Sequence, residues 1–404
     1  MTQNIKLHRG LVEAVVLAVQ QIFVENRQAD KVIEFTLKSN KKWGARDRAF
    51  IAENTYEIVR WWRLLKFVSN FSDSAETTQD FWYLTGAWFV LKKYDLPSWG
   101  EFQKIDAKSI AQKYEEAQSI RKIRESMPNW LDELAEQELG DAWDAEAKAL
   151  NGTASVYLRV NELKISRDDL QKKLAEAGIE THTVEGVPSA LVLEKRSNVF
   201  GTPFFKEGLF EVQDAGSQMI SQFLDLEPGM RVVDACAGAG GKTLHISTLM
   251  HGKGRVIALD VENWKLEELQ RRAKRNGISN TEVRLIEPKT IKRLRETADR
   301  LLLDVPCSGL GVLRRNPDSK WKIKPDFLEN IKKVQADILQ NYSQILKKGG
   351  KMVYATCSIL PSESEEQVQK FLAANANYQL LKEHRVSPAK DGFDGFYMAL
   401  IEKK

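Results

Sequence analysis

Cysteine and histidine are scarce in this chain. Its 404 residues include three cysteines and five histidines. These are too few for a disulfide framework, and their spacing is not that of a zinc site. We therefore expect no metal ion, and we expect free thiols of the kind that a reducing compartment keeps available for chemistry.

Long apolar runs are also absent. No stretch approaches the roughly 20 apolar residues that cross a membrane, and the polar start at residues 1–4 lacks the charged-then-apolar order of a secretory signal. The sequence shows no internal repeat and no low-complexity segment. These absences predict a cytoplasmic protein without a membrane partner. The formal net charge of +4 permits a nucleic-acid partner but does not establish one.

The first third of the chain has the periodicity of helices. From Leu7 to about Leu134, apolar residues recur every three to four positions, which predicts an all-helical domain. The pattern changes near Ser155, where short β-rich runs surround one helical stretch at residues 168–177. We expect a small α+β insert there.

From about Glu211, strand-like and helical segments alternate, which predicts a doubly wound, mainly parallel α/β sheet. The predicted strands are residues 231–234, 255–260, 282–286, 301–305 and 351–356. Later runs at residues 378–382 and 396–402 lie close together in the sequence, and we expect them to add an antiparallel edge. We place the domain boundaries at 145/146 and 210/211.

The three cysteines stand where ligands bind in such a sheet. Cys307 and Cys357 each follow an apolar run at the carboxyl end of a predicted strand, and Cys236 lies in a glycine-rich loop after another. Because the binding crevice of an open α/β sheet lies at these strand ends, all three thiols could converge on one site. Two thiols beside a nucleotide-type loop suggest covalent catalysis. The alternative is that the cysteines are buried and act as small hydrophobic side chains.

The loop at residues 234–243 follows a strand and opens a helix, where backbone N–H groups can meet a ligand. The phosphate pattern GxxxxGKS/T needs a glycine at Cys236, and the dinucleotide pattern GxGxxG needs one at Thr243, so each misses by one residue. Asp260, at the end of the next strand, is placed to accept hydrogen bonds from ribose hydroxyls. A nucleoside cofactor without a pyrophosphate fits, and S-adenosylmethionine is the commonest; a tight structural turn and an ATP site are the alternatives.

Three motifs in the second half of the chain resemble those of the RNA cytosine-C5 methyltransferases, most closely the Sun/Fmu (RsmB) branch. Residues 234–243 read DACAGAGGKT, residues 304–309 read DVPCSG and are followed by RRNPD, and residues 355–358 read ATCS. The flanking segments that agree with this branch are ARDRAF at residues 45–50, RVN at 159–161, GLF at 208–210 and DGFY at 394–397.

The resemblance covers nearly the whole chain and implies its architecture. It implies a Rossmann-like S-adenosylmethionine methyltransferase domain at residues 211–404, after an all-helical NusB-like RNA-binding domain at 1–145 and a small α+β RNA-binding or linking subdomain at 146–210. The expected activity is methylation of cytosine C5 in structured RNA, with small-subunit (16S) rRNA as the first expectation. Transfer RNA is the nearest rival, and the lack of sequence for a further domain after the closing strand favours the Sun/Fmu branch.

The resemblance also implies a role for each residue of the catalytic site. Cys357 is the expected nucleophile that adds to C6 of the cytosine, and Cys307 assists the later release of the methylated base. Asp304 would hold the edge of the ring, and Lys242 would face the same pocket and stabilise negative charge. The base that removes the C5 proton is not identified, and Cys307 is one candidate.

The expected cofactor is S-adenosyl-L-methionine. The residues implied for its site are Asp234, Cys236, Ala237, Gly238, Ala239, Gly240, Gly241, Lys242, Asp260, Glu287 and Asp304. Two positions depart from the family pattern: residues 238–239 are Gly-Ala where the family commonly has Ala-Pro, and residues 286–287 are Ile-Glu where it has Gly-Asp. Glu287 is the expected substitute at the adenine, and the Cys236 thiol itself is expected to be structural.

A basic segment follows the Cys307 turn, and we expect it to face RNA. Its residues are Arg314, Arg315, Lys320, Trp321 and Lys322. Cations suit phosphates and an indole ring can stack on a base, whereas the alternative is a solvated charge run. The cations within residues 271–275 are expected to be a solvated helix surface.

A function of another class is a non-catalytic RNA-binding assembly factor. Cys307, Cys357, Asp304 and Lys242 argue against it, because binding alone would not need both thiols. We expect a monomer whose partner is RNA, without an obligate protein partner.

Overall fold

The computed structural model describes residues 6–71 and 77–404. The chain divides into two compact units, one formed by residues 1–152 with 313–324 and the other by residues 153–312 with 325–404. The domain boundaries drawn from the sequence pattern stay a prediction. Among the described residues, no helix combines the length and the apolar character needed to cross a membrane.

The first unit is all-helical, as the periodicity of its sequence predicts. Its helices are α1 (Arg9–Val24), α2 (Ala29–Ser39), α3 (Ala45–Arg60), α4 (Trp62–Val68), α5 (Thr78–Leu91), α6 (Ala107–Ala117), α7 (Arg121–Arg124), α8 (Asn129–Leu139), α9 (Trp143–Leu150) and α16 (Ser319–Lys322). The largest apolar cluster joins the inner faces of α1, α3 and α5, with Val15, Ile58 and Phe89 fully buried. The three-to-four-residue spacing therefore marks the faces that pack together.

The second unit begins with a small antiparallel sheet. Its strands are β1 (Tyr157–Val160), β2 (Thr181–Thr183), β3 (Ala190–Leu193) and β4 (Phe210–Val212), in the order β2-β3-β1-β4. Helices α10 (Arg167–Glu176) and α11 (Pro203–Lys206) accompany it. The last strand, β4, pairs with β1 from Leu158↔Val212 to Val160↔Phe210, so this sheet reaches slightly past residue 210.

A seven-stranded sheet follows, in the order β10-β11-β9-β8-β5-β6-β7. Its strands are β5 (Arg231–Asp234), β6 (Arg255–Asp260), β7 (Thr281–Leu285), β8 (Ala298–Asp304), β9 (Leu346–Thr356), β10 (Tyr378–Val386) and β11 (Phe396–Lys403). Strands β5 to β9 pair in parallel, and β11 pairs antiparallel with both β9 and β10. The predicted doubly wound α/β fold with an antiparallel edge is confirmed.

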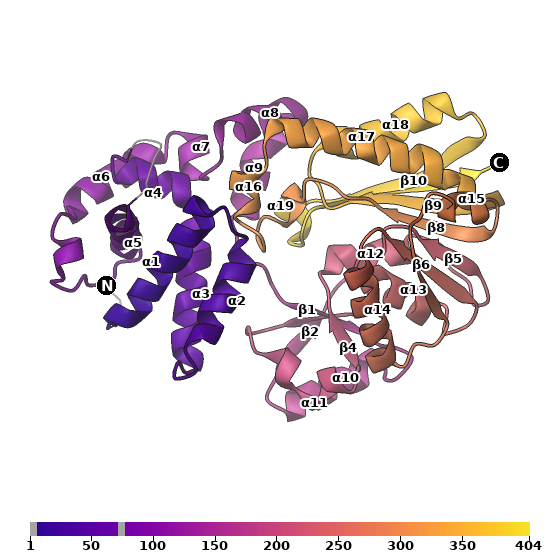
Figure 1. Cartoon of the computed structure of the whole chain (residues 1–404), viewed down its shortest axis with the longest axis horizontal. Coiled ribbons are helices and arrows are strands. Elements are labelled where there is room, and N and C mark those ends of the chain that lie inside the picture. Colours follow the sequence, from indigo (N-terminus) through magenta and orange to yellow (C-terminus); the bar gives the residue numbers. More distant parts are fainter. Residues whose placement is uncertain (1–5, 72–76) are drawn as a thin grey trace. The chain divides into compact units, whose positions relative to one another are not determined.

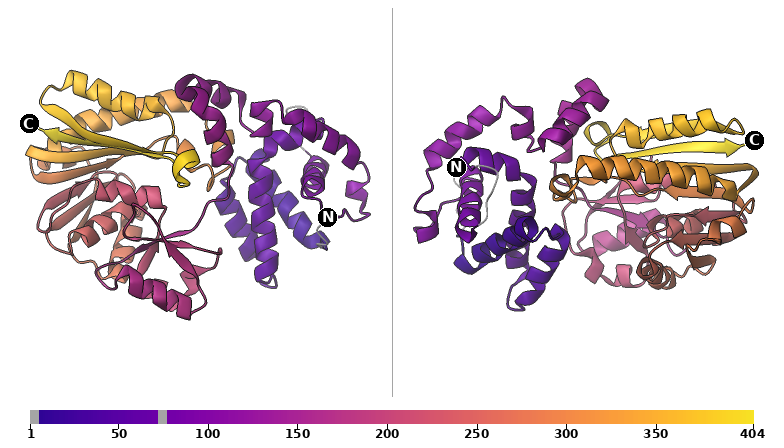
Figure 2. Two further views of the ribbon diagram at one scale, coloured as in Figure 1. Left: turned by 180° about the vertical axis from the view of Figure 1, so that it is seen from behind. Right: turned by 45° about the horizontal axis from the view of Figure 1, so that its top comes forward.

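Helices cover both faces of this sheet (Figures 1 and 2). They are α12 (Ala215–Gln222), α13 (Gly241–Leu249), α14 (Asn263–Asn276), α15 (Thr290–Arg293), α17 (Pro325–Tyr342), α18 (Glu365–Ala374) and α19 (Pro388–Asp391). Leu339 of α17 and Phe371 of α18 pack on one face, against Leu303 and its neighbours. Ile220 of α12 and Ile246 of α13 pack on the other. Both faces are apolar, as expected for the buried strands of a doubly wound sheet.

Strand β5 lies between β8 and β6. From β5 the chain runs outward through β6 and β7 on one side, and then returns to form β8 on the other side, so the strand order reverses at β5. Such a reversal opens a crevice at the carboxyl ends of the strands. The loops after β5, β8 and β9 carry Cys236, Cys307 and Cys357, respectively. The topology therefore brings the three loops of interest to one edge of the sheet.

Within the first unit, the segment 313–324 packs into the helical core through Trp321. The indole ring contacts the cluster that contains Val32 and Val59, and its Nε1–H donates to the carbonyl oxygen of Val59 at 2.7 Å. Nearby, the Asp318 carboxylate accepts from the N–H of Ala29 at the start of α2 (3.0 Å). The segment is thus part of the helical core.

We predict that Trp321→Ala destabilises the first unit by about 2–3 kcal/mol, because a half-buried indole and its hydrogen bond are lost. Urea unfolding, with hydrogen exchange of α3 amides, measures the effect. Lys324→Ala, at the exposed end of the same segment, is the matched control and should change stability by less than about 0.5 kcal/mol. Equal unfolding midpoints for the two variants would contradict the packing role of Trp321.

Candidate active site

The thiols of Cys307 and Cys357 lie in direct contact, with their Sγ atoms 3.1 Å apart. The backbone N–H of Cys357 also donates to Cys307 Sγ at 3.3 Å. The contact with Cys357, followed by burial, raises the pKa of the Cys307 thiol well above its usual range. Cys307 therefore keeps its proton at neutral pH, and its S–H group can donate to the sulfur of Cys357.

A half-buried ion pair lies in the same region of the sheet edge. Lys242 Nζ, on the first turn of α13, donates to Asp304 Oδ2 at the end of β8 at a distance of 2.6 Å. Burial acts to lower the pKa of Lys242, but the Asp304 carboxylate and then the charge of Cys357 outweigh it and raise that pKa. Lys242 is therefore a cation at neutral pH, and its charge acts on both Asp304 and Cys357.

The third cysteine has a different environment. Burial raises the pKa of the Cys236 thiol well above its usual range, and the carboxylates of Asp234, Asp304 and Asp260 raise it further. A thiol in these surroundings is poorly suited to act as a thiolate nucleophile. These surroundings favour the expectation that the Cys236 thiol has a structural role and not a catalytic one.

The glycine-rich loop is held against the end of β6 by Asp260. Its Oδ2 accepts from the N–H of Gly238 at 2.8 Å and its Oδ1 from the N–H of Glu262 at 2.9 Å. Gly240, the residue before α13, has φ = 87°, and a Cβ there would stand 2.4 Å from Leu269 Cγ. Only glycine fits this position. A carboxylate can accept about four hydrogen bonds, so Asp260 retains capacity for a ligand.

Asp234 has an unsatisfied oxygen at the same loop. Its Oδ2 accepts from the Thr243 hydroxyl at 2.7 Å, whereas its Oδ1 is buried without a hydrogen-bond partner among the described residues. Burial raises the pKa of Asp234 to about 7. A buried, unsatisfied carboxylate oxygen is costly, and a ligand that donates a hydrogen bond there would relieve the cost.

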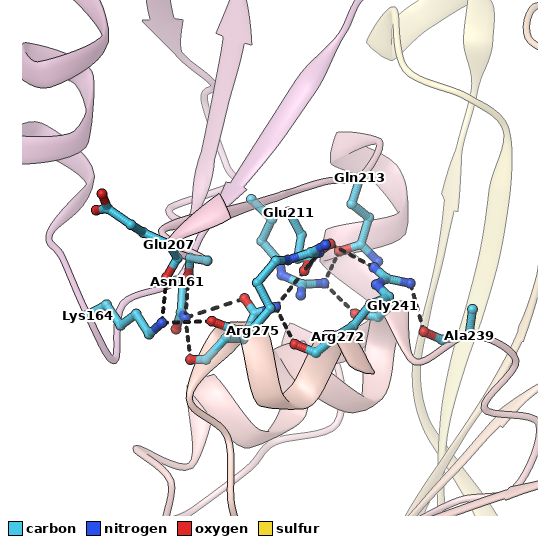
Figure 3. A network of polar contacts seen from close by, with 12 residues as sticks. Asn161, Lys164, Glu207, Glu211, Gln213, Ala239, Gly241, Arg272 and Arg275 are labelled. Atoms are coloured by element: carbon cyan, nitrogen blue, oxygen red, sulfur yellow. Dashed lines mark hydrogen bonds and ion pairs between the residues drawn. The ribbon is translucent and has the colours of Figure 1, made fainter. Parts of the chain in front are cut away.

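A network of arginines fixes the carbonyl groups of the loop (Figure 3). Arg272 of α14 donates to the Ala239 oxygen at 2.7 Å, and Arg159 of β1 donates to the Gly241 oxygen. Glu211 of β4 is buried and accepts from Arg272 at 2.9 Å, and it also accepts from Arg275 and Asn276. The small antiparallel sheet thus supports the glycine-rich loop from behind.

This network corrects one expectation from the sequence. Residues 271–275 were expected to be a solvated helix surface, but Arg272 and Arg275 turn toward buried Glu211. Arg271, whose side chain is 70% exposed, and Lys274, which is also exposed, fit the expectation. The RVN motif at residues 159–161 was the available signal, because Arg159 and Asn161 both contribute side-chain hydrogen bonds to this region.

The basic segment after the Cys307 turn is also oriented differently from the expectation. Lys320 is only 1% exposed; its Nζ donates to Asn151 Oδ1 at 3.2 Å, and burial lowers its pKa well below the usual range. Trp321 packs against the helical core. The side chains of Lys320 and Trp321 are therefore turned inward and do not extend into solvent, where RNA would bind. The RNA contacts expected of Arg314, Arg315 and Lys322 stay a prediction.

The remaining expected cofactor residue, Glu287, follows β7. Its N–H donates to the Thr290 hydroxyl at 3.0 Å, and it lines a pocket of about 250 Å³ together with Arg284 and Arg293. The N–H of the preceding residue, Ile286, donates to the carbonyl oxygen of Asp260 (2.9 Å). Glu287 therefore directly follows a residue that is hydrogen-bonded to Asp260, and its contact with an adenine stays a prediction.

We also searched the described residues for side chains that could bind a metal ion. In the part of the chain that the structure describes, no three or more His, Cys, Asp or Glu side chains form a group that could hold a metal ion. The chemical groups available at the site are a thiol pair, an ammonium–carboxylate pair and a glycine-rich loop with one unsatisfied carboxylate oxygen. This combination suits covalent attack on an electrophilic carbon beside a bound nucleoside.

Comparison with known proteins agrees with this arrangement. Residues 221–402 match the family model described as 16S rRNA methyltransferase RsmB/F, and residues 127–200 match one described as the RsmF/B-like methyltransferase ferredoxin-like domain. The two matches cover the large sheet and most of the small one.

Curated relatives carry related names. The chain is 38% identical over 259 residues to the probable ribosomal RNA small subunit methyltransferase B of Synechocystis, a match that covers 63% of this chain and 58% of that protein. It is 34% identical over 281 residues to ribosomal RNA small subunit methyltransferase B of Proteus mirabilis, which covers 69% and 66%. The matches span 58% and 66% of the length of these relatives.

A solved structure titled PH0851 shares the fold over both units. It covers 99% of this chain and 100% of its own chain, with a TM-score of 0.84 and 24% sequence identity. The fold of each unit is therefore one that an experimentally determined structure also adopts.

We predict that Arg272→Ala destabilises the second unit by about 2–3 kcal/mol, because buried Glu211 loses one of its cationic partners. Urea unfolding at pH 7 measures the change. Arg271→Ala, one residue away and exposed, should change stability by less than about 0.5 kcal/mol. Indistinguishable midpoints would show that Arg272 is a surface residue after all.

A second prediction concerns pH. The pKa of Asp234 is about 7 in the folded protein, but an unfolded aspartate titrates near 3.9. Between these values the unfolded chain binds fewer protons, so ionisation of Asp234 costs stability as pH rises, and the cost is complete above about pH 7. Asp234→Asn removes the cost while its amide oxygen can still accept from Thr243.

The free energy of unfolding of Asp234→Asn minus that of the wild type should therefore be larger at pH 8 than at pH 5, by about 1–3 kcal/mol. Urea unfolding without added ligand at both pH values provides the measurement. The same stability difference at the two pH values would contradict the raised pKa.

Proposed function

The chain belongs to the RsmB/F family of 16S rRNA methyltransferases, and from this premise we propose that it methylates C5 of a cytosine in structured RNA. The methyl donor that we propose is S-adenosylmethionine, and the proposed substrate is small-subunit rRNA. The observation that carries the proposal is the pair of thiols 3.1 Å apart, next to a half-buried Lys242–Asp304 ion pair. A protein that only bound RNA would have no use for that arrangement.

The chemistry of cytosine explains the need for a thiol. C5 is a poor nucleophile, but addition of a thiolate to C6 turns the ring into an enamine-like species with electron density at C5. In the proposed mechanism Cys357 forms the S–C6 bond. Loss of the C5 proton after methylation then lets the S–C6 bond break by elimination, which returns the Cys357 thiolate.

Lys242, Asp304 and Cys307 have separate parts in this proposal. Attack at C6 places negative charge on the ring, which the Lys242 ammonium would stabilise. The Asp304 carboxylate would accept from the exocyclic amine of cytosine and orient its edge. Cys307, held as a thiol, would assist the release of the methylated base.

The glycine-rich loop fits S-adenosylmethionine in three respects. The unsatisfied Asp234 Oδ1 would accept from the ammonium group of the methionine part, and Asp260 has capacity left for ribose hydroxyls. The obligate glycine at residue 240 keeps the backbone free of side-chain bulk at the start of α13. Bound there, S-adenosylmethionine supplies an electrophilic methyl group.

We extend the proposal to the helical unit, which we expect to be a NusB-like RNA-binding domain. Small-subunit rRNA offers hairpin loops whose bases are already unstacked, and such bases are accessible to an enzyme that must reach C6. Transfer RNA shares this property and is the rival substrate that the experiment below distinguishes.

The two thiols make the proposal testable. Cys357→Ala should reduce transfer of labelled methyl groups from S-adenosylmethionine to RNA by about a thousandfold or more, because the nucleophile is lost. Cys307→Ala should instead accumulate a covalent protein–RNA adduct, visible as a shifted band on a denaturing gel. Arg271→Ala, an exposed position, serves as the control and should behave like the wild type.

Total RNA from cells that lack the protein is the substrate, and bisulfite sequencing locates the new 5-methylcytosine. A methylated site in 16S rRNA supports the proposed substrate, and one in transfer RNA replaces it with the rival. Label incorporation that survives Cys357→Ala would overturn the assignment of the nucleophile.

A further inference from the structure

One fully buried acidic side chain beside the thiols has no part in the proposed reaction. Glu363 ends a short 3-10 helix, Pro361–Glu363, six residues after Cys357. We propose that Glu363 is a positioning residue: its carboxylate joins the two loops that carry the cysteines and so sets the spacing of the thiols. The spacing follows from the geometry alone, whereas its consequence for methylation rests on the proposed function.

The carboxylate of Glu363 accepts four hydrogen bonds from groups on three segments. Its Oε1 accepts from the N–H of Ser308 at 2.8 Å and from Gln335 Nε2 at 2.9 Å. Its Oε2 accepts from the hydroxyls of Ser308 and Ser358, both at 2.5 Å. Four donors fill the capacity of a carboxylate, which is the condition under which a buried negative charge is tolerated.

The two serines connect this carboxylate to the reacting atoms. Ser308 directly follows Cys307, and Ser358 directly follows Cys357. The serine hydroxyls also lie 3.3 Å from each other. A movement of either loop away from Glu363 would therefore move the attached cysteine and separate the two sulfurs.

Glu363 is itself anchored to the sheet and to α17. The hydroxyl of Tyr354, on β9, donates to the carbonyl oxygen of Glu363 at 2.8 Å. Gln335 of α17 donates to the carbonyl oxygen of Pro306 at 3.0 Å, in addition to its bond with Glu363. Glu363 and Gln335, which together form a clamp, therefore hold the Cys307 loop from two sides. They attach it to β9 and α17, which are rigid elements.

The loops have a second connection that does not involve Glu363. The N–H of Gly311 donates to the carbonyl oxygen of Cys357 at 2.9 Å. A variant without the Glu363 carboxylate should therefore remain folded while its loops lose their fixed spacing. A role in positioning can thus be separated from a role in folding.

Three substitutions test the inference. Glu363→Ala removes all four acceptor contacts. Glu363→Gln keeps an oxygen for the Ser308 N–H and Gln335, and its amide group can donate to the two serine hydroxyls, so it should rescue most of the geometry. Glu366→Gln, on the surface of α18 where Glu366 pairs with Lys370 at 3.0 Å, is the matched control.

The activity measurement separates positioning from cofactor binding. Glu363→Ala should lower kcat for RNA methylation about a hundredfold, as expected for misplaced reacting groups. Its KM for S-adenosylmethionine should stay within about twofold of the wild type, because the glycine-rich loop is not altered. Glu363→Gln should lie between wild type and Glu363→Ala, and Glu366→Gln should match wild type.

A chemical measurement of thiol spacing does not depend on enzyme activity. Phenylarsine oxide condenses with two adjacent thiols, so that two As–S bonds form and the oxygen leaves as water without a change of oxidation state. Wild-type protein should take up one equivalent, and mass spectrometry should map it to Cys307 and Cys357. Glu363→Ala should bind it about tenfold more weakly, because the effective concentration of the second thiol falls.

The outcomes distinguish the inference from the proposed function. Folded Glu363→Ala, verified by near-UV circular dichroism, that binds phenylarsine oxide like wild type would overturn the positioning role. If Glu363→Ala does not fold, an equal affinity of Glu363→Gln and a Glu363→Leu variant for the reagent overturns it in the same way. Weaker binding in Glu363→Ala, or weaker binding in Glu363→Leu than in Glu363→Gln, supports it even if the wild-type protein methylates no RNA. The absence of methylation would overturn only the proposed function.

Discussion

The active-site arrangement depends on the parallel pairing of β8 with β9. Their register sets Asp304 opposite Ala355, so the two cysteines, three and two residues further along, leave the sheet at the same edge. Strand β5 pairs with the other side of β8, with Asp234 opposite Leu302, and thereby brings the glycine-rich loop to that edge as well. Because side chains alternate between the faces of a strand, a slip of one residue would turn these groups to the wrong side.

Three of four buried or half-buried carboxylates at this edge are satisfied by ion pairs or hydrogen bonds within the protein, and one is not. Lys242 pairs with Asp304, Glu211 with Arg272, and Glu363 accepts four hydrogen bonds. Asp234 alone among the four carboxylates keeps a buried oxygen without a partner, at the expense of a raised pKa. On the proposed function, this oxygen is the one reserved for the cofactor.

The sequence predicted the fold better than it predicted the polar contacts. All seven strands of the large sheet could be found because apolar runs and turn residues are local signals. Arg272 and Glu211 are 61 residues apart, and Trp321 and Val59 are 262 apart, so no local pattern revealed that these side chains turn inward. Glu363 was missed for the same reason, because its donors come from Ser308, Gln335 and Ser358.

The close approach of the two thiols also imposes a difference between them. Two sulfurs 3.1 Å apart cannot both be anions without strong repulsion. The surrounding charges break the symmetry. Burial acts to lower the pKa of Lys242, and the charges of Asp304 and then Cys357 raise it. Glu363, by contrast, adds to the Cys357 contact and the burial that raise the pKa of Cys307. A cation therefore acts on the sulfur of Cys357, and a carboxylate acts on Cys307, which keeps its proton. On the proposed mechanism, the clamp that fixes the distance between the cysteines thus also helps to decide which of them attacks.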